Sequence, residues 1–329
     1  MSPNVDVVTV SIIIPTYNRP EQLYMVLENI AMQKFPLHVV QVVIADDGSK
    51  TPYDRVTTTN WPFQLDYFWQ VNQGEIPARN EAVKQAKGKY LVFLDDDIFI
   101  EPDYIPALIA DLVEYPLYIV LGVLFPKIND RASKFQVAMF KQATTDLSGD
   151  VPVTECGSGT MSMDKELFEK LGGMRTLGPG GRNAWGGMDF AYRASELGYR
   201  VRRCSEAKAV HDDYAFENLE TYSKRMQKVS RMAVLHFQRV PHLLPEVAMF
   251  HDKTPIEIGK DPAQLIVKKS LRKIISSHIA VKILGFIVKT LESFDVAPAL
   301  IRPLYRWIIG ASIYRGFNEG LIEYGMVKR

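Results

Sequence analysis

The feature that most constrains the fold of this chain is a run of five apolar or aromatic residues, 90–94, followed directly by Asp95, Asp96 and Asp97. Such a run predicts a strand buried on both faces, as in a parallel sheet. Three adjacent carboxylates repel one another unless a cation lies among them, and open α/β sheets bind ligands beyond the carboxyl ends of their strands. Hard oxygen ligands favour Mg²⁺ or Mn²⁺. The run therefore predicts either a divalent-metal site or an acidic turn before a helix.

Composition narrows the class of protein. The 329 residues are 47% hydrophobic and 23% charged, which suits a sizeable core in one large domain or a domain with an appendage. A net charge of +1 gives no global nucleic-acid signature, so we expect no nucleic-acid partner. Cys156 and Cys204 form no disulfide framework, which favours a reduced, cytoplasmic setting. Residues 1–9 lack the regions of a signal peptide, and no uninterrupted apolar run of about 18 residues predicts a spanning helix.

Apolar runs and helical periodicity alternate along the first third of the chain. The strands that the runs predict lie at residues 8–14, 39–45, 65–69 and 90–94. The helices that the periodicity predicts lie at residues 20–33, 76–86 and 102–115. Strands that alternate with helices form a parallel sheet with right-handed crossovers. This part therefore predicts an α/β fold with a doubly wound, nucleotide-binding sheet.

The pattern is looser from residue 120 onward. We expect strands at 119–125 and 199–203, helices at 132–144, 164–172, 189–197 and 223–240, a glycine-rich loop at 176–187 and a turn at 209–214. From residue 263 the chain carries 11 Lys or Arg and 4 Asp or Glu, against 28 and 34 in the rest. Two apolar stretches of this basic tail, 270–291 and 300–314, are interrupted by Lys and Arg. They predict amphipathic helices that either lie on an anionic membrane surface or pack against the body or a second subunit.

Polar residues follow the predicted strands at the points where a nucleotide could bind. The first strand leads into a turn with Pro15, Tyr17 and Arg19, and the second ends at Asp46 and Asp47. A carboxylate after the second strand can accept a hydrogen bond from a base N–H or a ribose hydroxyl, and this segment is equally natural as an ordinary turn. The segment after the first strand, taken alone, favours an ordinary turn.

Arg79 and Asn80 lie near the start of a predicted helix, before the strand that leads to the acids. An arginine there could pair with a diphosphate. The alternative is an exposed structural ion pair.

A second group of candidates lies downstream. Trp185 offers a stacking face for a sugar ring, and Gly186 and Gly187 let backbone approach a ligand. Asp189 follows at a predicted helix N-terminus, where it is either a site residue or only a cap. His211 is either structural or a third metal contact beside the acids.

Several enzyme classes lack their motifs here. The chain has no GxGxxG after the first strand, no Walker loop, and no Ser or Cys nucleophile motif with a plausible base. These absences argue against a dehydrogenase, a P-loop enzyme and a hydrolase.

Six motifs follow one another in a fixed order over about residues 9–240. They are SIIIPTYNR, VVIADDGS, GEIPARNEAVKQAKGKYLVFLDDD, GSGTMSMDKELFEKLGG, WGGMDFAYRASELGYRV and AVH. Together they resemble the family 2 glycosyltransferases of GT-A fold. The resemblance implies a mostly parallel central sheet flanked by helices, with a C-terminal helical appendage. It also implies inverting transfer of a sugar from a UDP-, dTDP- or GDP-sugar to a hydroxyl of a saccharide or lipid-linked glycan, with Mn²⁺ or Mg²⁺.

The resemblance also implies roles for individual residues. Asp97, Asp95 and His211 match metal contacts, and Asp189 matches the catalytic base. The acceptor side matches Trp185, Gly186 and Gly187, next to Met188 where the family often has Glu. The residues expected to contact the donor are Pro15, Tyr17, Arg19, Asp46, Asp47, Arg79, Asn80, Asp95 and Asp96.

The domains then follow from the resemblance and the tail. We expect a glycosyltransferase domain at 1–250, with a nucleotide-sugar half at about 8–120 and an acceptor half at about 120–250, and a basic helical tail at 263–329. The protein is expected to be cytoplasmic, peripheral on the inner face of the membrane, and able to form a homo-oligomer. Two alternatives are a sugar nucleotidyltransferase, which needs a glycine-rich phosphate loop missing here, and an inactive nucleotide-sugar-binding or membrane-scaffold protein.

Overall fold

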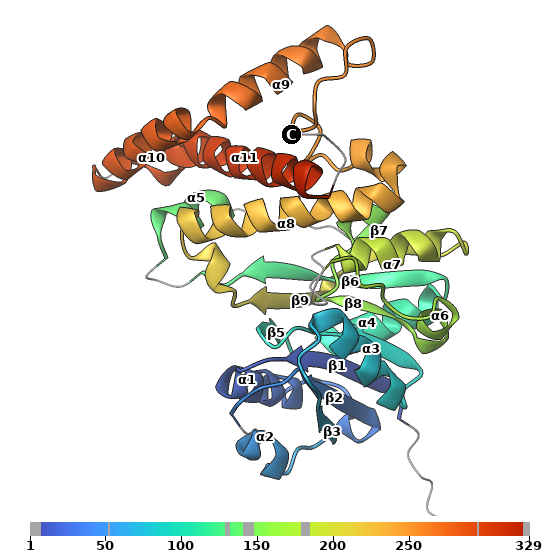
Figure 1. The fold of residues 1–329 in the computed structure, drawn as a ribbon. Helices are drawn as coiled ribbons and strands as arrows, with labels where there is room; N and C mark the ends of the chain where they lie inside the picture. The colour runs from blue at the N-terminus through green and yellow to red at the C-terminus, as the bar shows by residue number, and fades with distance from the viewer. Residues whose placement is uncertain are drawn as a thin grey trace, which may run out of the picture. The chain divides into compact units, whose positions relative to one another are not determined.

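The computed structural model describes residues 8–51, 53–128, 132–140, 148–178, 185–294 and 296–324. The chain divides into two compact units (Figure 1). We call Met1–Phe125 with Thr145–Asp212 the sheet unit, and Pro126–Thr144 with Asp213–Arg329 the helical unit.

The sheet unit is built on one mixed sheet, in the order β3-β2-β1-β4-β8-β6-β9-β5 with β7 paired to β9. The strands are β1 Val10–Thr16, β2 Val40–Asp46, β3 Gln64–Trp69, β4 Tyr90–Phe93, β5 Ile98–Ile100, β6 Tyr118–Pro126, β7 Gly149–Val151, β8 Met161–Asp164 and β9 Arg200–His211. β1 is parallel to β2 and β4, and β2 is parallel to β3, as the alternation of strands and helices predicts. β8 is antiparallel to β4 and β6, and β5 and β7 are antiparallel to β9, so the parallel part is one half of the sheet.

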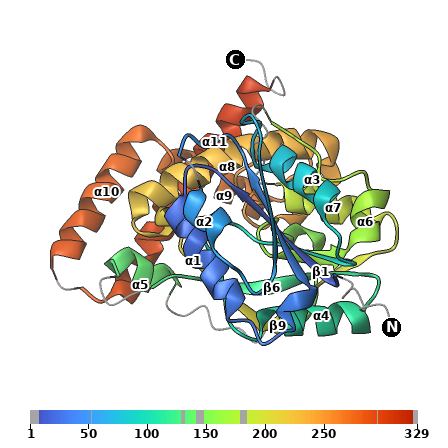
Figure 2. The same cartoon turned by 90° about the horizontal axis from the view of Figure 1, so that it is seen from below.

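Helices cover both faces of this sheet, and Figure 2 shows α1 and α3 on opposite sides of β1. One core holds residues of α1 Pro20–Ala31, α2 Asp54–Thr58 and α4 Tyr104–Glu114, and the other holds residues of α3 Glu75–Gln85, α6 Lys165–Lys170 and α7 Gly186–Ser195. Ile12 and Ile14 of β1 enter the first core, whereas Ile13 enters the second. Because successive side chains of a strand point to opposite faces, an apolar run is buried on both.

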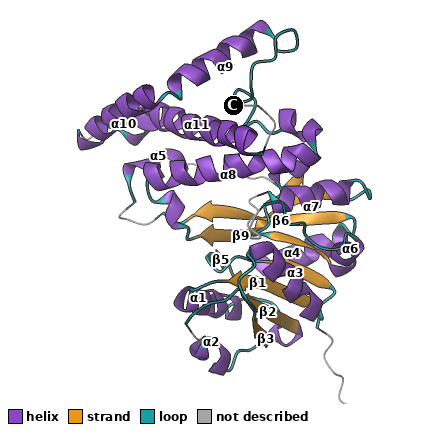
Figure 3. Ribbon diagram, viewed as in Figure 1, coloured by secondary structure: helices purple, strands orange, loops and turns teal. Residues whose placement is uncertain are grey.

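The helical unit consists of helices and loops in its described residues (Figure 3). Its α-helices are α5 Lys134–Phe140, α8 Leu219–Arg239, α9 Ala263–Ile275, α10 His278–Ser293 and α11 Pro298–Glu323. α11 packs along α8, and a Cβ at Gly316 would overlap the backbone carbonyl of Gln227. Glycine is therefore required for this close approach.

Membrane-spanning potential is limited in the described part of the chain. No single helix there is long and apolar enough to cross a bilayer. Only α9 and α10 together, bent by 75° at their junction, reach that length and composition.

The structure corrects several predicted elements. The residues 209–214, predicted as a turn, include the end of β9, which continues to His211. α7 begins at Gly186, three residues before the predicted start, and α8 begins at Leu219. The short strands β5, β7 and β8 were not predicted, because runs of three or four residues carry too little periodicity.

The helical unit takes in Pro126–Thr144 and the chain from Asp213 onward, and within it α8 packs with α11. The end of the glycosyltransferase domain at residue 250 stays a prediction. The described residues of the tail form three helices, where the prediction has two. Parts of the predicted helix at 132–144 and of the predicted loop at 176–187, residues 141–144 and 179–184, lie outside the described residues.

Candidate active site

The three acids after β4 differ in their bonding partners, although two of them share Arg19. Asp96 is 6% exposed and accepts hydrogen bonds from the Thr16 hydroxyl at 2.7 Å and from Arg19 Nη1 at 2.9 Å. Asp97 accepts from the same Arg19 nitrogen at 3.0 Å and lies 3.1 Å from His211 Nε2. Asp95 forms an ion pair with Arg79. The repulsion expected among the acids is thus offset by two arginines.

The same surroundings shift the two inner carboxyls in opposite directions. Burial raises the pKa of Asp96 to about 6, although Arg19 and Thr16 oppose the shift. Burial also acts on Asp97, but the hydrogen bond and charge of His211, together with Arg19, outweigh it and hold the pKa of Asp97 below its ordinary value. Of these two carboxyls, Asp97 is therefore the one that the site holds ionised more firmly.

His211 meets Asp97 because of strand pairing. The residue next to Asp97, Ile98 of β5, pairs with His211 at the end of β9. The Asp212 N–H also donates to the Asp97 carbonyl at 2.8 Å. Two antiparallel strands thus bring together residues far apart in sequence, and the turn predicted for His211 is replaced by a fixed strand position.

Arg79 and Asn80 make internal contacts in the structure. Arg79 is 1% exposed, and besides Asp95 it contacts Glu75 at 3.3 Å, so the exposed ion pair considered as an alternative is in fact a buried one. Asn80 donates to the Met174 carbonyl at 2.8 Å and accepts from the Met174 N–H at 3.0 Å. Both residues fix the surroundings of the acids, and direct contacts with a donor stay a prediction.

The carboxyl ends of β1, β2 and β3 gather the residues predicted for the nucleoside. Thr16, Asp46 and Trp69 are register neighbours across these strands, and Pro15 occupies the preceding position of β1. Tyr17 and Trp69 are 43% and 56% exposed, so two aromatic rings are accessible at this edge. Trp69 was not among the predicted site residues; its position at a strand end was the available signal.

Asp46 and Asp47 are held by donors of the protein itself. Asp46 accepts from the Tyr67 hydroxyl at 2.6 Å and the Ser49 N–H at 2.8 Å. Asp47 accepts from Gln70 at 2.8 Å and from the N–H groups of Gln73 and Gly74 at 2.9 and 2.8 Å. These bonds orient the loop after β3 against the loop after β2.

The start of α7 lies beside the segment that adjoins Asp95. A Cβ at Gly187 would lie 2.6 Å from the Cys156 carbonyl oxygen, and a Cβ at Gly159 would lie 2.5 Å from Asp95 Oδ2. Trp185 and Gly186, both buried, precede this contact. The structure therefore brings the predicted acceptor residues near the acids through the 156–159 segment.

Asp189 lies in the first turn of α7 but is only 2% exposed. Its Oδ2 accepts from Arg193 Nε at 3.0 Å, one helical turn away. Arg193 also donates to the carbonyls of Leu171 and Gly173 at 2.9 and 2.8 Å. Asp189 thus belongs to a buried ion pair that ties α7 to the end of α6, and its role as base stays a prediction.

The metal-binding capacity of the site rests on few donors. In the part of the chain that the structure describes, no group of three His, Cys, Asp or Glu side chains is arranged to hold a metal ion. Asp97 and His211 supply two adjacent donors, whereas Asp95 is paired with Arg79. A divalent cation here would need further ligands, such as phosphate oxygens.

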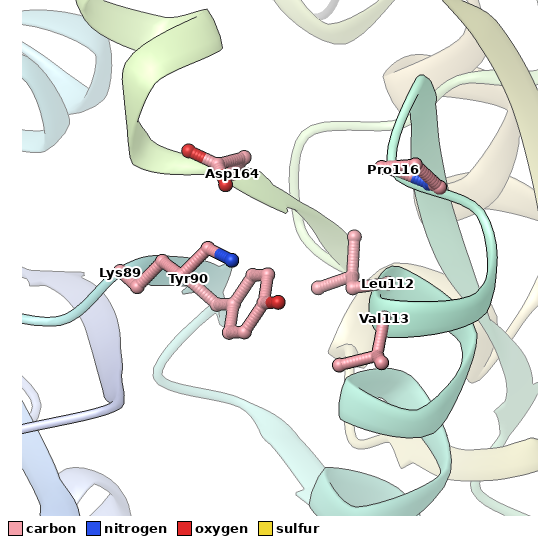
Figure 4. Close-up of a pocket in the computed structure, with 6 residues that line it drawn as sticks. All are labelled: Lys89, Tyr90, Leu112, Val113, Pro116 and Asp164. Carbon is pink, nitrogen blue, oxygen red and sulfur yellow. The ribbon is translucent and has the colours of Figure 1, made fainter.

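A small hollow of about 140 Å³ lies elsewhere on the sheet unit (Figure 4). It is lined by Lys89, Tyr90, Leu112, Val113, Pro116 and Asp164. Tyr90 is the first residue of β4, so the hollow is at the amino end of the strand whose carboxyl end carries the acids. It is separate from the candidate active site.

Comparison with known proteins identifies the class. Residues 11–172 match the family model described as Glycosyl transferase family 2. GlyA of Streptococcus pneumoniae, a glycosyltransferase, is 30% identical over 115 residues, which cover 34% of this chain and 16% of that protein. An uncharacterized glycosyltransferase of Haemophilus influenzae is 26% identical over 179 residues, which cover 50% of this chain and 56% of that protein. The aligned regions span less than two thirds of these relatives.

Solved structures agree on the fold. The first 349 residues of Staphylococcus aureus TarS in complex with UDP superpose with a TM-score of 0.53 at 19% identity, covering 98% of this chain and 93% of that one. The mannosyltransferase PcManGT of Pyrobaculum calidifontis, in complex with GDP-Man and Mn²⁺, superposes with a TM-score of 0.58 at 18% identity. The superposition covers 94% of this chain and 87% of that one. The chain therefore has the GT-A fold with a C-terminal helical region, as the motifs imply.

Proposed function

We propose that this protein is a metal-dependent, inverting glycosyltransferase that moves a sugar from a nucleotide-sugar donor to a hydroxyl acceptor, a saccharide or a lipid-linked glycan. The observation that carries the proposal is the contact of Asp97 with His211 and Arg19 at the carboxyl edge of the sheet. Ligands of open α/β sheets bind at this edge. Relatives that carry glycosyltransferase names support the reaction class.

The donor would lie along the carboxyl ends of β1 to β4. Tyr17 and Trp69 offer exposed rings for a base, and Arg19 is 38% exposed at the side chain, which leaves it accessible to a diphosphate. The neighbours bind UDP, UDP-GlcNAc or GDP-Man, which supports this class of donor and leaves its base and sugar open.

Asp97 and His211 would hold the divalent cation, with the diphosphate oxygens completing its coordination. When bound, such a cation stabilises negative charge on the leaving diphosphate. Mn²⁺ in the solved structure of PcManGT supports the choice of metal. Arg19 remains bonded to Asp96 and can move toward a phosphate without losing every partner.

Asp189 is the residue that we propose as the general base. It would take the proton of the acceptor hydroxyl as that oxygen attacks the anomeric carbon from the side opposite the leaving diphosphate, which gives inversion. Because the carboxylate is 2% exposed, an acceptor would have to displace neighbouring groups to reach it. Its ion-pair partner in the structure is Arg193, one helical turn away.

The test of the site is calorimetry of nucleotide binding with and without Mn²⁺. UDP-, GDP- and dTDP-sugars are first ranked by the thermal stabilisation that each gives with Mn²⁺, and the best is then titrated. We expect Asp97→Ala to abolish the Mn²⁺-dependent part of binding. Asp103→Ala, which removes an exposed carboxylate bonded to Lys34, is the matched control and should bind as the wild type does. Unchanged binding by Asp97→Ala would exclude this metal site.

A further inference from the structure

Helices α9 and α10 belong to the helical unit and are labelled in Figure 1. Each leaves a stripe of large apolar side chains in solvent. The members of this stripe, which we call the apolar face, are Val267, Leu271 and Ile274 on α9 and Ile279, Ile283, Phe286 and Ile287 on α10. Each of these side chains is between 39% and 73% exposed. Their spacing of three, four, seven and eight residues places them on one side of each helix.

The apolar face is opposite the side by which the two helices pack. The buried residue of α9 is Lys269, and that of α10 is Val288. Because each residue advances a helix by about 100°, Lys269 lies roughly 200° from Val267, and Val288 lies half a turn from Ile279. α11 contacts both helices. Packing within the unit therefore covers the other side and leaves the apolar face unpartnered.

Basic side chains accompany this face. Residues 263–293 contain six Lys or Arg and one acid, Glu292. The Lys residues that are exposed are Lys268, Lys273, Lys282 and Lys289. No ion pair found among the described residues uses any of these four. On α10, Lys282 and Lys289 are seven residues apart and so flank the apolar stripe along one edge.

We propose that the apolar face of α9 and α10 docks on the surface of an anionic lipid bilayer, with both helices lying in the interfacial plane. Apolar side chains beside a row of Lys match a bilayer, which offers anionic headgroups next to an apolar layer. A protein partner fits less well, because the cores of protein interfaces are depleted in Lys. This inference goes beyond sugar transfer and depends on no residue of the candidate active site.

The experiment is co-sedimentation of the full-length protein with vesicles of phosphatidylcholine, alone or mixed with phosphatidylglycerol. The variants are Ile283→Ser with Phe286→Ser, and Lys282→Glu with Lys289→Glu. The matched controls are Val113→Ser, an exposed apolar residue of α4, and Lys84→Glu, an exposed lysine of α3. Circular dichroism and thermal melting establish that each variant is folded.

We expect the wild type to bind the anionic vesicles at least about tenfold more tightly than the neutral ones, because each basic residue near an anionic surface adds to binding. Each double variant should lose about tenfold or more of this binding, and the controls should keep it. Failure of the wild type to pellet with anionic vesicles would overturn the proposal, as would equal losses in the controls. Light scattering that shows a dimer abolished by Phe286→Ser, without vesicle binding, would assign the face to a second copy instead.

Discussion

The buried pair of Asp189 and Arg193 gives the sharpest prediction, because two variants of it should rank in opposite order for stability and for activity. In Asp189→Asn the amide oxygen can still accept the hydrogen bond from Arg193 Nε, now 3.0 Å from the carboxylate. In Arg193→Gln the carboxylate is left buried without its cation, and the bonds to the carbonyls of Leu171 and Gly173 are weakened.

The magnitudes follow from these contacts. Replacing a charged hydrogen bond with a neutral one costs about 1 kcal/mol. Removing one partner of a buried ion pair costs about 3–5 kcal/mol, and Asp189 at 2% exposure is within this class. Loss of a general base lowers the rate by about 10²–10⁴. Asp189→Asn should therefore be the more stable variant and the less active one.

The assay measures kcat for transfer, nucleotide affinity and melting temperature for both variants in parallel. We expect nucleotide affinity within about twofold of wild type in Asp189→Asn, with kcat lower than in Arg193→Gln. If Asp189 were only a structural partner of Arg193, the variant that is less stable would also be less active. If the two variants ranked in the same order for stability and for kcat, the assignment of Asp189 as base would be refuted.

Two further predictions use glycines with matched controls. Gly316→Ala should destabilise the helical unit by about 1–3 kcal/mol in thermal or denaturant unfolding, because its Cβ would overlap the backbone of α8. Gly285→Ala has open space around the new Cβ, so this control should be neutral or stabilising. Gly159→Ala should weaken Mn²⁺-dependent nucleotide binding about tenfold, because its Cβ would displace the carboxylate of Asp95, whereas Gly157→Ala meets nothing and should bind normally. Equal effects within either pair would contradict the packing from which they are derived.

The first half of the fold could be predicted from the sequence because its signals are local. The apolar runs at 8–14, 39–45 and 90–94 become β1, β2 and β4 within two residues at each end. Each run is buried on both faces, and the first two are each followed by a helix, so pattern and topology agree there.

The contacts of the site could not be read in the same way, because they depend on pairing between distant strands. His211 reaches Asp97 through the pairing of β5 with β9, and β5 is only three residues long. Likewise, the bond from Tyr67 to Asp46 depends on the register of β3 against β2. The sequence identified the acids and the histidine, whereas their partners required the folded sheet.

The charges of the site explain why a donor and a cation should bind together. Asp95, Asp96 and Asp97 carry three negative charges when ionised, and in the described contacts they are paired with the two arginines Arg19 and Arg79. Glu75 also contacts Arg79, so the carboxylates of the site outnumber its arginines. A donor diphosphate alone would add two negative charges to this site, which is unfavourable at short range. A divalent cation that arrives with it leaves the balance unchanged. Because Arg19 divides its bonds between Asp96 and Asp97, binding of Asp97 to a cation frees Arg19 to approach the diphosphate while Asp96 still holds it. Nucleotide affinity should accordingly rise with Mn²⁺ concentration, and this dependence should weaken in Arg19→Gln.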